Sequence, residues 1–344
     1  MSQTETPADR GGDHRARLAA LRSLLDQRGG AAALLTTRRN FAWLTAGGVA
    51  HVLQSVETSV AGLLVTRDDL VVITQNIEAA RLADEELGGI GLEVVAVPWW
   101  EPRAIEAEAS RRLPAGVRPV EDIELEPELS RIRSVLSPAD QERMADLGRM
   151  AVDAMDAALS TVGPGMTEDD AVAELLRHLP GVRTPVVLAA ADARIARYRH
   201  PLPGATPIRS RVMLVLVAER WGLHVALTRI REIEAPSADL ARRIEAVGAV
   251  QAAMHAATQP GATLGDVLSV AQSTYADTGF SDEWRDHHQG GSIGYQARER
   301  VALPDDPTVI EPGMAFAWNP SIAGAKAEDT IVITEGVART VTAE

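Results

Sequence analysis

Pro164-Gly165-Met166-Thr167 leads into a helix-forming segment in which Asp170 stands three residues after the threonine. The same arrangement returns 96 positions later as Pro260-Gly261-Ala262-Thr263, followed by Asp266. In a Thr-x-x-Asp capping box the two side chains satisfy backbone N–H groups at the start of a helix. The pattern therefore predicts two helices that begin in the same way.

The segments around these two boxes also correspond. A long helix is expected before each box, at 140–159 and 237–257, because apolar residues recur there at helical spacing. Strand-like segments follow both boxes: Pro185–Ala189 and Val212–Val217 in the first half, Ala315–Trp318 and Thr330–Thr334 in the second. This repeated order predicts a duplicated α+β domain. Two unrelated capped helices remain the alternative.

The chain before this region reads as a separate small α/β domain. Residues 1–13 are polar and are expected to form a disordered tail. Helices are expected at 15–28 and 77–87, and strands at 31–35, 62–66, 70–74 and 92–97. Ser137-Pro138 is typical of a helix start, with serine as N-cap and proline at the first helical position. These signals predict domains at 14–130 and 131–344.

Composition limits the possible partners and location. The formal net charge of −14 argues against binding to nucleic acid or to an anionic membrane surface. There are no cysteines, so disulfides, thiolate metal sites and a cysteine nucleophile are excluded. The N-terminus lacks the apolar core of a secretory signal, and no apolar run of eighteen residues occurs. A cytoplasmic protein is expected.

The sequence His287-His288-Gln289-Gly290-Gly291 combines two histidines with a glycine-rich turn. Glycine lets the main chain approach a ligand closely, and imidazole exchanges protons near neutral pH. His200 lies between an expected helix and strand, where a loop can place it in a cleft. These residues are the candidate catalytic groups.

Residues 130–344 resemble the pita-bread superfamily of Xaa-Pro aminopeptidases, prolidases, methionine aminopeptidases and creatinases. The N-terminal domain resembles that of creatinases at Asn40-Phe41-Ala42-Trp43-Leu44-Thr45. The matching motifs of the second domain are, in order, Arg131-Ile132-Arg133-Ser134, Pro164-Gly165-Met166-Thr167-Glu168, His200, Gly222 through Arg229, His287–Glu299, Glu311-Pro312-Gly313-Met314-Ala315-Phe316 and Glu328-Asp329-Thr330. The resemblance implies the pita-bread fold over nearly the whole chain.

Active peptidases of that superfamily hold two metal ions with two aspartates, one histidine and two glutamates. At the matching positions this chain has Ala226, one of the apolar residues 215–217, Gly291, Asn319 and Glu328. One carboxylate and one amide cannot hold two divalent ions. Neither a bound metal nor another cofactor is therefore expected.

Creatinases resemble this chain in lacking a metal, and they cleave a C–N bond with a histidine as proton shuttle. The matching histidine is His200, which is expected to act as general base or acid with Glu328 orienting it. His287 or His288 would be the second proton carrier. Arg298 followed by Glu299 resembles the creatinase pair whose arginine grips a substrate carboxylate, as a guanidinium fork can.

Further residues are expected to contact the substrate. Asn319 would hydrogen-bond to it where family members have a ligand carboxylate. Arg229 and Tyr295 lie within the matching motifs and are also assigned to substrate binding. Trp318 lies beside a motif and receives the same assignment, although it suits core packing equally well.

These inferences predict a metal-independent hydrolase that acts on a C–N bond of a small carboxylated amide, amidine or modified amino acid. One alternative is an Xaa-Pro peptidase with a rearranged metal site built from His287, His288 and Glu328. Another is a catalytically inactive pita-bread protein that uses its pocket for binding. The resemblance also implies a homodimer.

Overall fold

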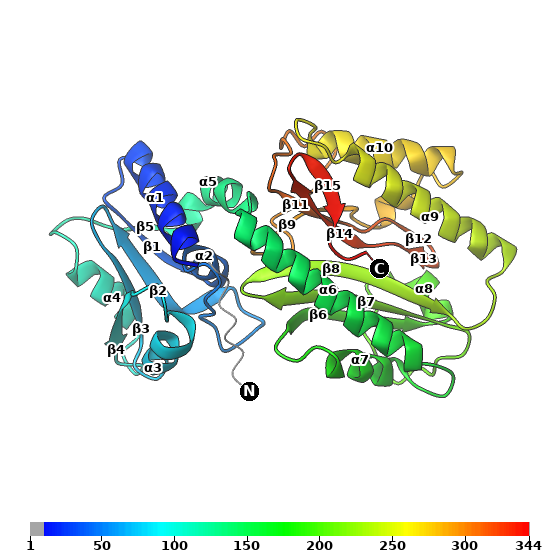
Figure 1. Cartoon of the computed structure of the whole chain (residues 1–344), viewed down its shortest axis with the longest axis horizontal. Helices are drawn as coiled ribbons and strands as arrows, with labels where there is room; N and C mark the ends of the chain where they lie inside the picture. The colour runs from blue at the N-terminus through cyan, green and yellow to red at the C-terminus, as the bar shows by residue number, and fades with distance from the viewer. Residues whose placement is uncertain (1–9, 344) are drawn as a thin grey trace. The chain divides into compact units, whose positions relative to one another are not determined.

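The computed structural model describes residues 10–343, which form two compact units (Figure 1). The first comprises residues 10–133 together with 221–223, and the second comprises the remaining described residues. Both mix helices with strands, as the sequence predicts. Within residues 10–343, every helix is too short or too polar to cross a bilayer.

The first unit is built on a five-stranded sheet with the order β4-β3-β2-β1-β5. Its strands are β1 (Ala32–Thr37), β2 (Thr58–Thr66), β3 (Leu70–Gln75), β4 (Glu93–Val97) and β5 (Val120–Glu121). Its helices are α1 (Arg10–Arg28), α2 (Arg38–Leu44), α3 (Ala79–Arg81), the π-helix η1 (Leu82–Glu86), α4 (Ala104–Arg111) and α5 (Asp122–Ser134). The predicted strands 62–66 and 70–74 lie within β2 and β3, which pair in antiparallel fashion.

The predicted disordered tail requires a correction at its end. Residues 1–9 lie outside the described residues, but residues 10–13 form the first turn of α1. This turn is ordered because its polar side chains have partners: Arg10 Nε donates to the carbonyl of Thr45, and Asp13 pairs with Arg17 at 3.3 Å.

The second unit consists of two successive halves. The first half contains α6 (Pro138–Thr161), α7 (Glu168–Arg177), β6 (Arg183–Ala191), α8 (Ala193–Arg197), β7 (Arg211–Arg220) and β8 (Leu223–Glu232). The second contains α9 (Ala238–Ala257), α10 (Leu264–Asp277), the 3-10 helix η2 (Glu283–Asp286), β9 (Gly290–Ile293), β10 (Arg300–Val301), β11 (Ala315–Trp318), β12 (Ser321–Ile322), β13 (Ala325–Lys326), β14 (Asp329–Thr334) and β15 (Val337–Thr340). In Figure 1, α9 and α10 lie side by side in the second half, whereas α6 and α7 pack against β7 of the first.

The duplication extends from the two capping boxes to the surrounding backbone. Both boxes are formed, at Thr167 and at Thr263. Each threonine also makes an isolated antiparallel bridge to a later segment, Thr167 to Pro207 and Thr263 to Val309. Strand order matches as well, because β6-β7-β8 of the first half corresponds to β9-β11-β14 of the second. The second unit is therefore a duplicated α+β domain, as the repeat predicted.

The two halves meet where β8 of the first half lies beside the start of β14 in the second. Thr228 on β8 donates its backbone N–H to the carbonyl of Glu328 at 3.1 Å, just before β14. Two residues away, the backbone N–H of Ala226 donates to Thr330 Oγ1 at 2.8 Å, and that hydroxyl donates to the carbonyl of Ala226. This junction brings β8 and Glu328 together, although they are about 100 residues apart in the chain.

Candidate functional site

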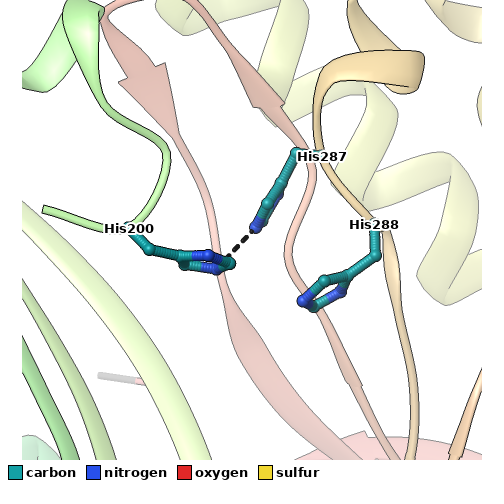
Figure 2. A group of neighbouring side chains, drawn as sticks. All are labelled: His200, His287 and His288. Atoms are coloured by element: carbon teal, nitrogen blue, oxygen red, sulfur yellow. Dashed lines mark hydrogen bonds between the residues drawn. The ribbon is translucent and has the colours of Figure 1, made fainter.

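The imidazoles of His200, His287 and His288 converge on one point of the second unit (Figure 2). His200 follows α8 in a loop, and the other two residues follow η2. The Nε2 atoms of His200 and His287 lie 3.0 Å apart, which is a hydrogen-bond distance. His288 completes the group, with its ring centroid 4.6 Å from that of His287 and 5.8 Å from that of His200. The structure thus brings the three predicted catalytic histidines together.

A set of buried hydrogen bonds holds His287 in place. Ser321 Oγ lies 3.3 Å from His287 Nδ1, so the Nε2 atom is left to face His200. Gln289 Nε2 donates to the carbonyl of His287, and Gln289 Oε1 accepts the hydroxyl of Tyr275 at 2.8 Å. No role for Gln289 could be inferred from the sequence alone. In the structure its side chain supports the histidine loop, residues 287–289.

The carboxylate of Glu328 is buried between two cations. Arg298 Nη2 lies 3.2 Å from its Oε1, and Lys326 Nζ lies 3.1 Å from its Oε2. Thr228 Oγ1 donates to the same Oε2 at 2.7 Å. Both carboxylate oxygens of Glu328 therefore have partners within the protein. The cluster of Arg298, Lys326 and Glu328 carries a net charge of +1.

Lys326 was missed by the sequence analysis, although it is the single lysine among the 344 residues. Its side chain is only 5% exposed, which is unusual for lysine. Of the 34 lysines and arginines in the sequence, Lys326 is the one lysine. This rarity is the feature of the sequence that could have drawn attention to it. Lys326 and Glu328 are two residues apart in extended backbone, which places both side chains on one face.

These charges and the surrounding packing keep the histidines neutral. Burial and the charge of Lys326 lower the pKa of His287 to about 2. Desolvation of the ring and the charge of Arg298 lower the pKa of His288 to about 4, although part of this residue remains exposed. The pKa of His200 is lowered by the same two effects, desolvation and the charge of Lys326. At neutral pH each ring therefore offers a lone pair.

The acid in this group stays ionised. Burial favours the neutral carboxyl, but Lys326 and Arg298 outweigh it and lower the pKa of Glu328 to about 2. Glu328 is consequently the counter-ion of the two cations. It influences the histidines through charge, because it raises the pKa of His200, His287 and His288 against the effect of Lys326.

The positions that the sequence resemblance assigns to a metal pair do not fit one here. Ala226 is fully buried, and residues 215–217 of β7 are buried and apolar. Glu328, the one matching carboxylate, is neutralised by Lys326 and Arg298. No combination of these positions supplies the carboxylates that a two-metal centre needs.

The sequence resemblance places Gly291 where the peptidases have a histidine ligand, and the structure leaves no room there for a side chain. A Cβ atom at Gly291 would lie 2.0 Å from the carbonyl oxygen of Arg300, and its φ of 157° is one that L residues rarely adopt. The neighbouring Gly290 is as restricted, since a Cβ there would lie 2.1 Å from the carbonyl oxygen of Ala317. Neighbouring backbone atoms therefore occupy the space that a ligand side chain would need at either glycine.

Asn319, a predicted substrate contact, lies beside the histidine loop. Its backbone N–H donates to the carbonyl of Gln289 at 3.1 Å, and its side chain is buried. Among residues 10–343, no group forms a hydrogen bond with its Oδ1 atom. An unsatisfied buried amide oxygen costs free energy, which a donor group on a bound molecule would recover.

Three residues assigned to substrate binding have structural partners instead. Trp318 is fully buried in the core beneath α9, where its indole N–H donates to Thr258 Oγ1 at 2.9 Å. The Tyr295 hydroxyl lies 3.0 Å from both carboxylate oxygens of Asp140, at the start of α6. Both side chains are buried and make their polar contacts within the protein.

Arg229 is likewise tied to the protein. Its guanidinium pairs with Asp329 at 3.0 Å and donates to the carbonyl of Thr342 at 2.6 Å. It also lines a pocket of about 260 Å³ whose other walls include Lys326 and residues of α9. In these contacts Arg229 connects Asp329 with the backbone of Thr342, and its guanidinium already binds a carboxylate of the protein.

The sequence matches the model of the metallopeptidase family M24 over residues 142–335, which is more than half of the chain. The chain belongs to family M24. This M24 protein is 28% identical over 205 residues to the Xaa-Pro dipeptidase of Pyrococcus horikoshii, a match that covers 55% of this chain and 57% of the relative. The chain thus spans little more than half the length of that curated relative.

Solved structures show the same fold over nearly all of the M24 protein. The dipeptidase PepE of Mycobacterium ulcerans superposes with a TM-score of 0.78 at 21% identity, over 98% of both chains. The prolidase of Pyrococcus horikoshii superposes with a TM-score of 0.79 at 18% identity, over 95% of this chain and 98% of the other. The predicted pita-bread fold is therefore confirmed over nearly the whole chain.

Proposed function

We propose that this M24 protein hydrolyses a C–N bond in a small carboxylated amide, amidine or modified amino acid without the two-metal centre of its family. The observation that carries this proposal is the 3.0 Å contact between His200 and His287, beside the charge cluster of Arg298, Lys326 and Glu328. It supplies proton carriers and an anion-binding charge at the same place.

The net positive charge near the histidines favours a substrate with a carboxylate. Arg298 and Lys326 contribute two charges against the one of Glu328, and both cations are largely buried. A substrate carboxylate would neutralise the remaining charge in surroundings where electrostatic interactions are strong. The unsatisfied Oδ1 of Asn319 would accept an N–H of the same molecule.

Acid–base chemistry would come from His200, because its ring is exposed enough to meet the substrate and is neutral at pH 7. In this mechanism His200 accepts a proton as the oxygen of water bonds to the carbonyl or amidine carbon. It then returns a proton to the nitrogen that leaves when the C–N bond breaks. With an amide substrate, an N–H of His287 or His288 would stabilise the negative oxygen of the intermediate. Such general base catalysis contributes about 10²–10⁴-fold.

The test uses untagged protein dialysed against a chelator and a panel of carboxylated amides, amidines and Xaa-Pro dipeptides, with amine release as readout. We expect turnover in the presence of chelator, and a loss of at least about 100-fold in kcat for His200→Ala. His178→Ala is the matched control, since this exposed histidine lies outside the cluster and pairs with Glu174.

Three results would contradict the proposal. Activity that vanishes with chelator and returns with metal would establish a metallopeptidase. Undiminished turnover in His200→Ala would exclude its role as base. Tight binding of a panel compound without turnover would favour the inactive binding protein. A homodimer in the cytoplasm, the remaining expectation from the sequence, is tested by light scattering and by cell fractionation.

A further inference from the structure

We propose that His200, His287 and His288 bind one divalent transition-metal ion, at a site that differs in position and ligand type from the family's two-metal centre. Each residue offers one ring nitrogen, and the three nitrogens lie within 4.8 Å of one another. Figure 2 shows the three rings directed at a common space. Three imidazoles with an open fourth position are a ligand set of mononuclear zinc sites.

The distances require little rearrangement. Zinc–nitrogen bonds of about 2.0–2.1 Å at a tetrahedral angle place two ligand nitrogens about 3.3 Å apart. The Nε2 atoms of His200 and His287 are already 3.0 Å apart. His288 must approach by a rotation of its side chain, and its partial exposure leaves room for that rotation.

The orientation of His287 also suits a ligand. Histidines that bind metals usually engage their second ring nitrogen in a hydrogen bond, which fixes the ring. Ser321 Oγ provides this contact at Nδ1, and Arg199 Nη1 donates to the same hydroxyl at 3.3 Å. His287 Nε2 is thereby directed away from these groups and towards the other two rings.

The chemistry of the donors selects the ion. Imidazole suits Zn²⁺, Co²⁺, Ni²⁺ and Cu²⁺, whereas Mg²⁺, Ca²⁺ and Mn²⁺ prefer carboxylates. The carboxylate of Glu328, whose charge acts on all three rings, is held by Lys326 and Arg298 and is not available as a ligand. Because these three groups leave one positive charge, the fourth ligand is expected to be an anion.

Metal binding and the proposed acid–base mechanism use the same atoms. A lone pair that coordinates an ion cannot accept a proton, so occupancy of the site should stop turnover by His200. This regulatory consequence rests on the proposed function. The binding of the ion does not, because it depends only on the three side chains.

Binding is measured on untagged, chelator-treated protein by titration with Co²⁺, followed through its visible absorption, and with Zn²⁺ by calorimetry. We expect one ion per chain and at least a tenfold weaker affinity in His288→Ala. His288→Gln keeps the side-chain volume as a second variant, circular dichroism checks folding, and His178→Ala is expected to bind as the wild type does. Absence of binding, or equal affinity in both His288 variants and the wild type, would overturn the site.

Turnover measured during the same titration separates the two proposals. If activity falls as the site fills, both hold. If one ion binds and activity rises with it, the site stands and the metal-independent mechanism is wrong. If chelator-treated protein is active and binds no ion, the site is wrong and the proposed function stands.

Discussion

Lys326 Nζ lies 3.1 Å from Glu328 Oε2, in a position where both side chains are almost completely buried. Arg298 contacts the other oxygen of the same carboxylate at 3.2 Å. Glu328, which the sequence resemblance matches to a metal-binding glutamate, is here the counter-ion of two cations. The three side chains together carry a net charge of +1, which favours an anion over a cation beside them.

Replacing Lys326 by Met should destabilise the protein by about 3–5 kcal/mol, because breaking a buried ion pair leaves a carboxylate with fewer partners. Lys326→Arg keeps the charge and should lose clearly less. Urea unfolding followed by fluorescence measures both variants. If the two variants unfold at the same urea concentration as the wild type, the buried pair does not contribute as described.

The features that sequence predicted best are local. A capping box lies within four residues, so Thr167 with Asp170, and Thr263 with Asp266, could be recognised without knowledge of the fold. The strand β11 also has the predicted bounds, Ala315–Trp318, because a short apolar run between turn signals is itself local.

The composition of the site was only partly accessible. The resemblance placed His200 and His287 together, although their contact joins residues 87 positions apart. It assigned nothing to Ser321 or Lys326, because their roles depend on contacts with His287 and Glu328 that form only in the folded chain. Proximity to a motif was misleading for Trp318, whose side chain faces the core while its neighbour Asn319 lies beside the histidine loop.

Stability should fall as pH decreases from neutral. Histidines whose pKa in the folded state lies below the unfolded value of about 6.5 bind fewer protons when folded. The unfolded chain therefore gains protons first, from pH 6.5 down to about 4 for His288 and about 2 for His287. Each such histidine steepens the decline by about 1.4 kcal/mol per pH unit at most.

The measurement is urea unfolding at pH 7, 6 and 5, where the depressed pKa of Glu328 contributes little because that effect begins only near pH 4.5. His287→Asn should show a shallower decline over this range, since it removes one titrating group. His178→Ala serves as the control. An unchanged slope in His287→Asn would mean that His287 is protonated at an ordinary pH. Activity, if carried by neutral His200, should persist below pH 6.5.

Restoring the family's histidine at position 291 should fail. A Cβ atom there would lie 2.0 Å from the carbonyl oxygen of Arg300, so Gly291→His must displace the backbone of β10. We expect a loss of at least about 3 kcal/mol or no soluble protein, since overpacking and backbone strain each cost about 1–3 kcal/mol.

Gly294→Ala is the matched control for the same turn. A Cβ at Gly294 meets its nearest neighbour, Glu299 Oε1, at 3.6 Å, an ordinary contact distance. Thermal unfolding should therefore place this variant near the wild type and Gly291→His far below it. A stable Gly291→His protein that binds metal would show that the loop can reopen.

Tyr295→Phe should weaken the fold and leave catalysis intact. The variant removes a hydroxyl that donates to Asp140, a buried carboxylate at the first turn of α6 that also pairs with Arg143 at 3.1 Å. Losing one hydrogen bond to a charged group should cost about 1–3 kcal/mol. Since Tyr295 is 2% exposed and directed at α6, kcat and KM should change less than twofold.

The comparison is with Tyr198→Phe, in which the ring is 39% exposed and little stability should be lost. Chemical unfolding and steady-state kinetics on the same preparations give both quantities. If Tyr295→Phe raised KM tenfold without loss of stability, the hydroxyl would have to reach the substrate, and its bond to Asp140 would not describe its role. A stability loss with constant KM would instead identify Tyr295 as the residue that anchors the 294–299 turn to α6.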